Sequence, residues 1–304
     1  MHRRDAIAAI VTGLSAPFVA CAGRFYSKPV PAPDFASLER QLRGRVGVSV
    51  LDVASRRQLT YRADERFPLC STFKWLLAAH VLSRVDHGRE ELTRFIPYAQ
   101  GNLLEHAPIT RAQVTSGGMT ISALLGAAIR YSDNTAANLL LRSVGGPSAL
   151  TAYLRSIGDA ITRMDRVEPE LNNAVPGDVR DTTTPRAMVG ALNALLVQDR
   201  LSVSSRALLL SWLEGNTTGA EKLRAGLPGG WRVGDKTGAG GYGTTNDVAI
   251  IWPSADRPLL VAAYLTETTA SLAARNQALA AIGHAVAMWV QAAYVPRAAK
   301  ARVV

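Results

Sequence analysis

Alternating apolar positions predict β-strands at both ends of the chain. Residues 45–52, RVGVSVLD, place valines two positions apart, and RQLTYR at 57–62 follows after a short link, which predicts a β-hairpin. Further apolar runs, separated by turns that contain Gly or Pro, predict three more strands at 231–235, 248–252 and 259–266.

Between these strands, apolar positions recur three and four apart, which is typical of helices. The predicted helices span 72–85, 120–131, 134–144, 147–156, 185–197 and 204–214, and a last one spans 271–295. Strands at both ends around a helical middle predict an α+β fold in which the two ends share one sheet. We expect an α/β domain at 31–62 and 215–304, an inserted all-α domain at 63–214, and a site in the cleft between them.

The first thirty residues have a different character. Arg3 and Arg4 precede an apolar run at 6–20 that is too short to span a bilayer, which predicts a signal peptide and tether at 1–30 and export to the periplasm. The paired arginines favour the twin-arginine route. Cys21 either carries a lipid anchor or is discarded with the leader, and both alternatives remain open.

Composition narrows the classes of function. With 48% hydrophobic and 19% charged residues, the chain is typical of a globular protein. The net charge of +10 comes from dispersed basic residues, so we expect no nucleic-acid partner, whereas a small acidic substrate is compatible. Only Cys70 remains after the leader, which excludes an intramolecular disulfide in the fold. No clustered metal ligands occur, so neither a metal nor a cofactor is expected.

CSTFK at 70–74 places Ser71 at the start of a predicted helix and Lys74 one turn later. Residues three apart share a helix face, so we expect the Lys74 amine near the Ser71 hydroxyl, where it could act as a base if burial lowers its pKa. The backbone N–H of Ser71 could stabilise an oxyanion. The alternative is a helix cap beside a surface lysine.

SDN at 132–134 lies between two predicted helices. The Ser132 hydroxyl could relay a proton to a leaving nitrogen, and the Asn134 amide could bind a substrate carbonyl. Asp133 could hold its loop by accepting backbone N–H groups. These residue types are also the commonest in turns and caps, so the tripeptide alone does not decide between the two interpretations.

GDKTGAGG at 234–241 does not have the spacing of a phosphate-binding loop. On an edge strand, Lys236 and Thr237 could instead bind a substrate carboxylate. Gly238 would give the ligand close access to the backbone, and the Ala239 N–H would be a second oxyanion donor. An ordinary glycine-rich turn is the alternative.

Together, SxxK, SDN and KTG in this order form a set found in class A β-lactamases and penicillin-binding proteins. From about residue 35 onward the chain resembles class A serine β-lactamases of the proteobacterial chromosomal type, also through DERFPLCSTFK at 64–74, GDVRDTTTP at 177–185 and WRVGDKTG at 231–238. The resemblance implies a two-domain serine β-lactamase/transpeptidase-like fold with a five-stranded antiparallel sheet. It also implies hydrolysis of the β-lactam amide of penicillins and cephalosporins, giving antibiotic resistance.

The segment RVEPELNN at 166–173 distinguishes a class A β-lactamase from a transpeptidase. Glu168 and Asn172 have the ExxxN spacing that resembles the lactamase Ω-loop, here about 163–181, in which the two side chains hold the hydrolytic water. The resemblance further implies a cis bond before Pro169 and an ion pair between Arg166 and Asp181. Penicillin-binding transpeptidases lack this segment.

The resemblance also implies roles for individual residues. Ser71 is the expected nucleophile, Ser132 the proton relay and Glu168 the base for deacylation; whether Lys74 or Glu168 is the acylation base stays open. The oxyanion donors are expected to be the backbone N–H groups of Ser71 and Ala239. The expected substrate-binding residues are His106, Asn134, Asn172, Lys222, Lys236, Thr237, Gly238 and Ala239. For His106, which matches a position at the edge of the cleft, a plain surface histidine is the alternative.

The sequence departs from the family at two places. Thr245 and Lys222 occupy the positions at which relatives carry an arginine near KTG, and lysine lacks the planar guanidinium fork, which leaves carboxylate affinity and clavulanate turnover open. Cys70 matches one half of the disulfide of some carbapenem-hydrolysing relatives, but the matching position is Gly240. We therefore expect Cys70 to be a buried, small apolar side chain.

Rival functions remain. The nearest are a DD-peptidase and a penicillin-binding protein that does not hydrolyse its ligand, both disfavoured by Glu168 and Asn172. A Ser-His-Asp esterase is disfavoured because no GxSxG occurs. We expect a monomer with β-lactams as substrates and clavulanate-like inhibitors as further ligands, and with membrane contact only through a lipid on Cys21.

Overall fold

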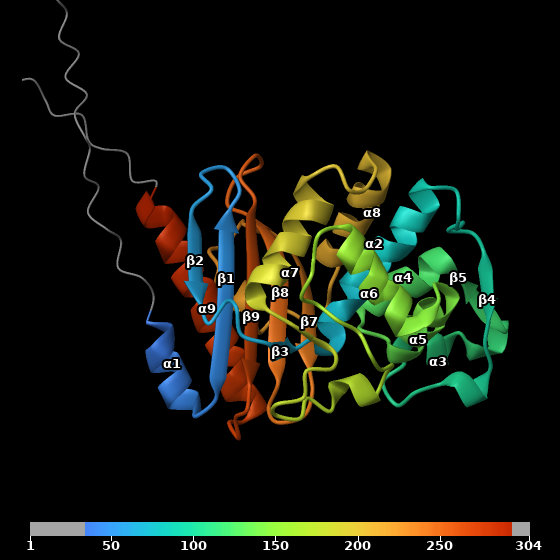
Figure 1. Cartoon of the computed structure of the whole chain (residues 1–304), viewed down its shortest axis with the longest axis horizontal. Coiled ribbons are helices and arrows are strands. Elements are labelled where there is room, and N and C mark those ends of the chain that lie inside the picture. The colour runs from blue at the N-terminus through green and yellow to red at the C-terminus, as the bar shows by residue number, and fades with distance from the viewer. Residues whose placement is uncertain (1–33, 294–304) are drawn as a thin grey trace, which may run out of the picture. The chain divides into compact units, whose positions relative to one another are not determined.

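The computed structural model describes residues 34–293. Its main sheet has the order β2-β1-β9-β8-β7, and each neighbouring pair is antiparallel (Figure 1). The strands are β1 (Arg45–Asp52), β2 (Gln58–Tyr61), β7 (Arg232–Ala239), β8 (Thr245–Trp252) and β9 (Leu259–Thr266). Because β1 pairs with β9 along its whole length, the two ends of the chain share one sheet. The predicted α+β class with a five-stranded antiparallel sheet is confirmed, and β7 is an edge strand as expected.

One face of the sheet packs against α1 (Phe35–Leu42) and α9 (Leu272–Ala293) (Figure 1). Alternate strand residues point to this side, including Val46 and Val48 of β1 and Val261 of β9, where they contact Leu279 and Ile282 of α9 in one buried cluster. The alternation predicted for β1 therefore determines which of its side chains pack against α9.

The other face packs against helices from the middle of the chain. Of these, α7 (Pro185–Leu192) and α8 (Val203–Glu214) contact the strands. The same buried cluster includes α2 (Phe73–Asp86), α4 (Ile121–Arg130), α5 (Asn134–Ser143) and α6 (Gly146–Ser156). The predicted helices match these bounds within a few residues, and a π-helical segment, Asn193–Val197, continues α7 to the predicted end. All ten residues from Phe73 to Leu82 of α2 are buried, so the first turn of this helix lies in the protein interior.

Several short elements were not predicted. They are α1, α3 (Pro108–Ala112), the pair β3 (Phe67–Pro68) and β6 (Thr182–Thr183), and the pair β4 (Phe95–Pro97) and β5 (Gly118–Thr120). Two or three residues are too few to show an alternating pattern. Helix α1 is stabilised locally, because the Asp34 side chain accepts a hydrogen bond from the Ser37 N–H at 2.8 Å.

The predicted signal peptide, with Arg3, Arg4 and Cys21, lies outside the described residues. Within residues 34–293, no helix is long and apolar enough to cross a membrane. The division into an α/β domain and an all-α domain at residues 62/63 and 214/215 stays a prediction.

Candidate active site

Ser71 and Lys74 lie where the chain enters α2. Ser71 is the middle residue of a 3₁₀ turn, Cys70–Thr72, that runs directly into α2, and Lys74 is in the first turn of the helix. Cys70 has φ 44° and Ser132 has φ 57°, both in the left-handed region that is unfavourable for residues with a side chain. Such strain is concentrated at functional sites. Here it occurs at Ser132 itself and at Cys70, the residue before Ser71.

The Glu168 carboxylate links the two residues at the start of α2. Its Oε1 lies 3.0 Å from Lys74 Nζ and accepts a hydrogen bond from Ser71 Oγ at 3.4 Å. The side chains of Lys74 and Glu168 are both fully buried. A buried ion pair of this kind is stable only if the remaining donors and acceptors are also satisfied, so the surrounding contacts matter.

Ser132 lies between two lysines. Lys74 Nζ donates to the Ser132 carbonyl oxygen at 2.7 Å and to Asn134 Oδ1 at 2.5 Å, and it lies 3.4 Å from Ser132 Oγ. Lys236 Nζ donates to Ser132 Oγ at 3.0 Å. The SxxK, SDN and KTG residues, which are far apart in the sequence, therefore form one hydrogen-bonded group.

Burial changes the acidity of both lysines. It lowers the pKa of Lys74, while the opposite charge of Glu168 acts to raise it. Burial also lowers the pKa of Lys236 to about 7, and the positive charge of Lys74 adds to this effect. A lysine with a lowered pKa is more often present as the neutral amine, which can accept a proton.

The segment around Glu168 is held by paired amide contacts. Asn172 Nδ2 donates to Glu168 Oε2 at 2.5 Å, and the Asn138 side chain bonds both the N–H and the carbonyl oxygen of Glu168, at 3.0 and 2.8 Å. The Glu168–Pro169 bond is cis, as expected. The expected ion pair is also present, with Arg166 Nε 2.6 Å from Asp181 Oδ2.

Asp133 ties its loop to the neighbouring α3, as the sequence suggests. The buried carboxylate accepts from the N–H groups of Ile109 and Thr110, and it caps α5 by accepting from the Ala136 N–H. These bonds fix the start of α5 and thereby the positions of Ser132 and Asn134.

Strand β7 runs beside the segment that carries Ser71. A Cβ atom added at Gly238 would lie 3.0 Å from the Leu69 carbonyl oxygen, so this position has no room for a larger residue. Lys236 Nζ donates to Ser132 Oγ, and Thr237 Oγ1 contacts Thr218 Oγ1 at 2.5 Å. Ala239 ends the strand and is exposed.

The other expected binding residues lie around this group. His106 is exposed, and its carbonyl oxygen accepts from the Asn134 N–H at 2.9 Å, which places it beside the start of α5. Lys222 Nζ donates to the carbonyl oxygen of Thr218 at 3.2 Å, and the Thr218 hydroxyl contacts that of Thr237. Thr245, opposite Ala239 in the sheet, accepts a hydrogen bond from Arg275 of α9 at 3.1 Å.

Cys70 is fully buried and free, as expected. A Cβ atom added at Gly240 would lie 2.6 Å from its Sγ, so position 240 does face the thiol, and glycine there provides no partner for a disulfide. Burial raises the pKa of the Cys70 thiol, and the nearby negative charge of Glu168 adds to this. The side chain therefore packs as a small apolar group.

Two supporting residues escaped the sequence analysis. Asn138 could have been found, because it follows Asn134 by four positions and so shares its helix face. Arg275 gave no signal, since only the packing of α9 against the sheet places it beside Thr245. Within residues 34–293, no group of three or more His, Cys, Asp or Glu side chains could hold a metal ion.

Comparison with known proteins identifies the family. A model described as the beta-lactamase enzyme family matches residues 32–290. The chain belongs to this family. Its relatives include beta-lactamase OXY-2 of Klebsiella oxytoca, 48% identical over 80% of this chain and 84% of the relative. Beta-lactamase CTX-M-8 of Citrobacter amalonaticus is also 48% identical, over 81% of this chain and 84% of the relative.

Solved structures place the chain within class A of the β-lactamases. The ancestral GNCA class A beta-lactamase is 57% identical, with a TM-score of 0.81, over 83% of this chain and 96% of that one. The class A beta-lactamase of the last common ancestor of Gram-negative bacteria, GNCA4, is 58% identical. Its TM-score is 0.81, over 83% of this chain and 95% of that one. The class A β-lactamase assignment and fold expected from the three motifs are confirmed.

Proposed function

We propose that this class A β-lactamase hydrolyses the amide bond of penicillins and cephalosporins in two steps and thereby gives antibiotic resistance. In the first step, Ser71 Oγ attacks the carbonyl carbon of the four-membered ring, an ester forms, and the C–N bond of the amide breaks. In the second step, water cleaves the ester and frees the enzyme. Each step needs a base: Glu168 or Lys74 serves the first step, and Glu168 serves the second.

The contacts around Ser71 support the acylation step. The hydroxyl proton leaves toward Glu168, whose Oε1 is 3.4 Å away, or toward Lys74, which shares that oxygen at 3.0 Å. The leaving nitrogen then takes a proton from Ser132 Oγ, which Lys74 and Lys236 both contact. The choice between Lys74 and Glu168 as first base stays open, because Glu168 Oε1 contacts both Ser71 Oγ and Lys74 Nζ.

Deacylation is supported by the pairing of Glu168 with Asn172. Glu168 Oε2 accepts from Asn172 Nδ2, and the other amide atom, Asn172 Oδ1, is buried without a partner among the described residues. A water molecule bound by this amide oxygen and the carboxylate would lie beside the ester of Ser71. Glu168 takes its proton as the oxygen attacks the ester carbonyl.

The remaining residues bind the substrate in this proposal. Lys236 and Thr237 hold its carboxylate, assisted from behind by Lys222, and Gly238 lets the ligand approach the strand. Asn134 binds the acylamino side chain, with His106 at the edge of the cleft. The N–H groups of Ser71 and Ala239 stabilise the oxyanion.

The contact of one carboxylate with Ser71, Lys74 and Asn172 carries this proposal, and Glu168→Ala tests it. We expect steady-state nitrocefin hydrolysis to fall by about 10²- to 10⁴-fold, the usual contribution of a general base. Intact-protein mass spectrometry should then show a stable acyl-enzyme. Glu170→Ala, which removes an exposed carboxylate two residues away, is the control and should keep normal turnover.

A penicillin-binding protein that acylates without hydrolysis is the alternative. It predicts one equivalent of nitrocefin consumed by the wild type and no further turnover. Equal turnover of the wild type and Glu168→Ala would instead refute Glu168 as the deacylation base.

We also propose that the chain is exported to the periplasm by the twin-arginine route and acts as a monomer, with clavulanate-like inhibitors entering the same cleft. The mass of the mature protein tests processing and distinguishes a lipid on Cys21 from loss of the leader. Sedimentation tests the monomer.

A further inference from the structure

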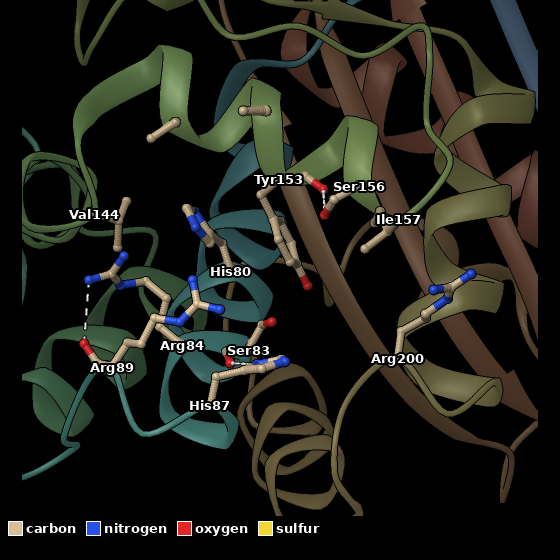
Figure 2. Close-up of a pocket in the computed structure, with 12 residues that line it drawn as sticks. His80, Ser83, Arg84, His87, Arg89, Val144, Tyr153, Ser156, Ile157 and Arg200 are labelled. Carbon is tan, nitrogen blue, oxygen red and sulfur yellow. Dashed lines mark hydrogen bonds between the residues drawn. The ribbon is translucent and has the colours of Figure 1, made fainter.

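The end of α2 opposite Lys74 lines a cavity of about 530 Å³. His80, Ser83 and Arg84 of α2 form one side together with His87, which caps the helix, and Tyr153 of α6 is in the middle (Figure 2). In this view, Arg200 lies beyond Tyr153 from Arg84 and Arg89. The cavity is built by other residues than the active site and shares with it only the helix α2.

The charges around this cavity have one sign. Three arginines line it, and no carboxylate is among the lining residues. Two acidic side chains close to the cavity have hydrogen-bond partners: Glu90 is paired with Arg94 at 2.6 Å, and Asp86 accepts from Ser202, which caps α8, and from Ser205 of α8. These two carboxylates offset part of the charge of the three guanidinium groups. Neither carboxylate lines the cavity, so the potential inside it is positive.

Two buried nitrogen atoms beside the cavity lack a partner. Nδ1 of His80, a residue only 9% exposed, and Nε of Arg84 have no hydrogen-bond partner among the described residues. The His80 ring is stacked on Tyr153, with centroids 4.6 Å apart and an angle of 10°, which fixes its orientation. Burial, with the charge of Arg84, lowers the pKa of His80 to about 4, so the imidazole is neutral at pH 7. The Arg84 Nε–H is therefore a buried donor without an acceptor, and His80 Nδ1 is a second one in the tautomer that carries its proton there. Such donors are costly, and an acceptor-rich ligand would remove that cost.

Arg84 and Arg89 are held close together. Arg84 Nη2 donates to the Arg89 carbonyl oxygen at 3.4 Å, which brings two cationic side chains to the same side of the cavity (Figure 2). Guanidinium groups match the geometry of phosphate and carboxylate oxygens and bind them through paired hydrogen bonds.

We propose that this cavity is a second ligand site, which binds a small anion with two or more negative charges on phosphate or carboxylate groups. Arg84 and Arg89 bind one anionic group, and His80 and Ser83 supply further hydrogen bonds. Arg200 accounts for the preference for more than one charge, because it contributes a cation from the other side of Tyr153.

The test is isothermal titration calorimetry of the wild type with pyrophosphate, with citrate and with acetate at equal ionic strength. We expect saturable binding of pyrophosphate or citrate at one site, and much weaker binding of acetate. Arg84→Gln should weaken the affinity by about tenfold, since a hydrogen bond to a charged group contributes about 1.5 kcal/mol or more. Arg40→Gln removes an exposed arginine on α1 and should leave the affinity within about twofold, because exposed pairs contribute little.

Nitrocefin turnover shows whether each variant is folded, and Arg84→Gln should keep it, since Arg84 contacts none of the residues around Ser71. If Arg84→Gln does not fold, the exposed Arg89→Gln replaces it and should also weaken pyrophosphate binding. Absence of saturable binding by either multivalent anion would overturn the proposal. So would equal affinities of the Arg84→Gln, Arg89→Gln and Arg40→Gln variants, which would indicate attraction by net charge or binding at Lys236 instead.

Discussion

Two walls of the active site are supported from behind by different kinds of contact. The Ω-loop wall, residues 163–181, is closed by the Arg166–Asp181 ion pair. Around Glu168 itself it is held by amide hydrogen bonds, with Asn138 at the backbone and Asn172 at the carboxylate. The β7 wall, Arg232–Ala239, is supported by buried charges. Behind Lys236, the fully buried Asp235 is bonded to Arg224 Nε at 2.6 Å and to Asn216 at 2.7 Å.

The difference predicts different failures. Neutral amide contacts such as those of Asn138 contribute about 1 kcal/mol each and mainly fix geometry, so their loss should affect turnover before stability. A buried charge that loses its partner is far more costly, so damage to the β7 wall should appear first in the free energy of unfolding. Asp247, opposite Thr237 in the neighbouring strand, is a second buried acidic residue beside the β7 wall. Burial and the charge of Asp235 raise its pKa well above its usual value.

Removing Arg224 should have the largest effect. Arg224→Gln leaves the Asp235 carboxylate buried without its cation, and we expect the free energy of unfolding to fall by about 3 kcal/mol or more. Urea denaturation measures it. The control is Arg232→Gln on the same strand, whose partner Glu214 is 3.6 Å away in an exposed pair, and it should cost about 1 kcal/mol or less. Equal losses in the two variants would contradict the view that buried charge supports this wall.

Asn138→Ala tests the Ω-loop wall. Both backbone bonds to Glu168 are lost, so we expect kcat for nitrocefin to fall about tenfold or more, with KM nearly unchanged and a smaller loss of stability than in Arg224→Gln. Stopped-flow and steady-state kinetics separate acylation from deacylation. Asn173→Ala, an exposed amide in the same loop, is the control. A rise in KM with kcat intact would show that Asn138 supports substrate binding rather than Glu168.

This contrast also explains what could be predicted from the sequence. The residues proposed to face the substrate belong to short motifs, so Ser71, Ser132, Glu168 and Lys236 could be named in advance. The long strands and helices followed from their apolar periods. The supporting residues lie at positions set by packing. Asp235 stands inside the KTG strand, but nothing in its sequence neighbourhood indicates that Arg224 is its partner.

The short elements were missed for a related reason. Strands β3 and β6 have two residues each, and Phe67 pairs with Thr183, which is far away in the sequence. Local patterns carry no information about such pairs, because their stability comes from the neighbouring helices and sheet rather than from intrinsic preference.

The charge of Lys236 should make substrate affinity depend on pH. Its pKa is lowered to about 7, so its ammonium form is present below this pH and is lost above it. If Lys236 binds the substrate carboxylate, KM for a penicillin should rise by up to about fivefold between pH 7 and pH 8, as the charged fraction falls. Lys236→Arg keeps its charge in this range and should remove the pH dependence of KM. A KM that rises equally in both proteins would place the titrating group elsewhere.

Cys70 lies where the two walls meet, and the smallest effect is expected there. Its Sγ faces position 240 at the end of the β7 wall, and the neighbouring Gly241 N–H donates to the carbonyl oxygen of Asn172 in the Ω-loop wall at 2.8 Å. Because the thiol is buried and its pKa is raised, iodoacetamide should not label the native protein, whereas it should label the unfolded one. Cys70→Ala should cost about 1 kcal/mol of stability and leave kcat unchanged, since the backbone bond between Gly241 and Asn172 remains. Rapid labelling of the native protein, or a large loss of kcat, would mean that the thiol itself holds the two walls in register.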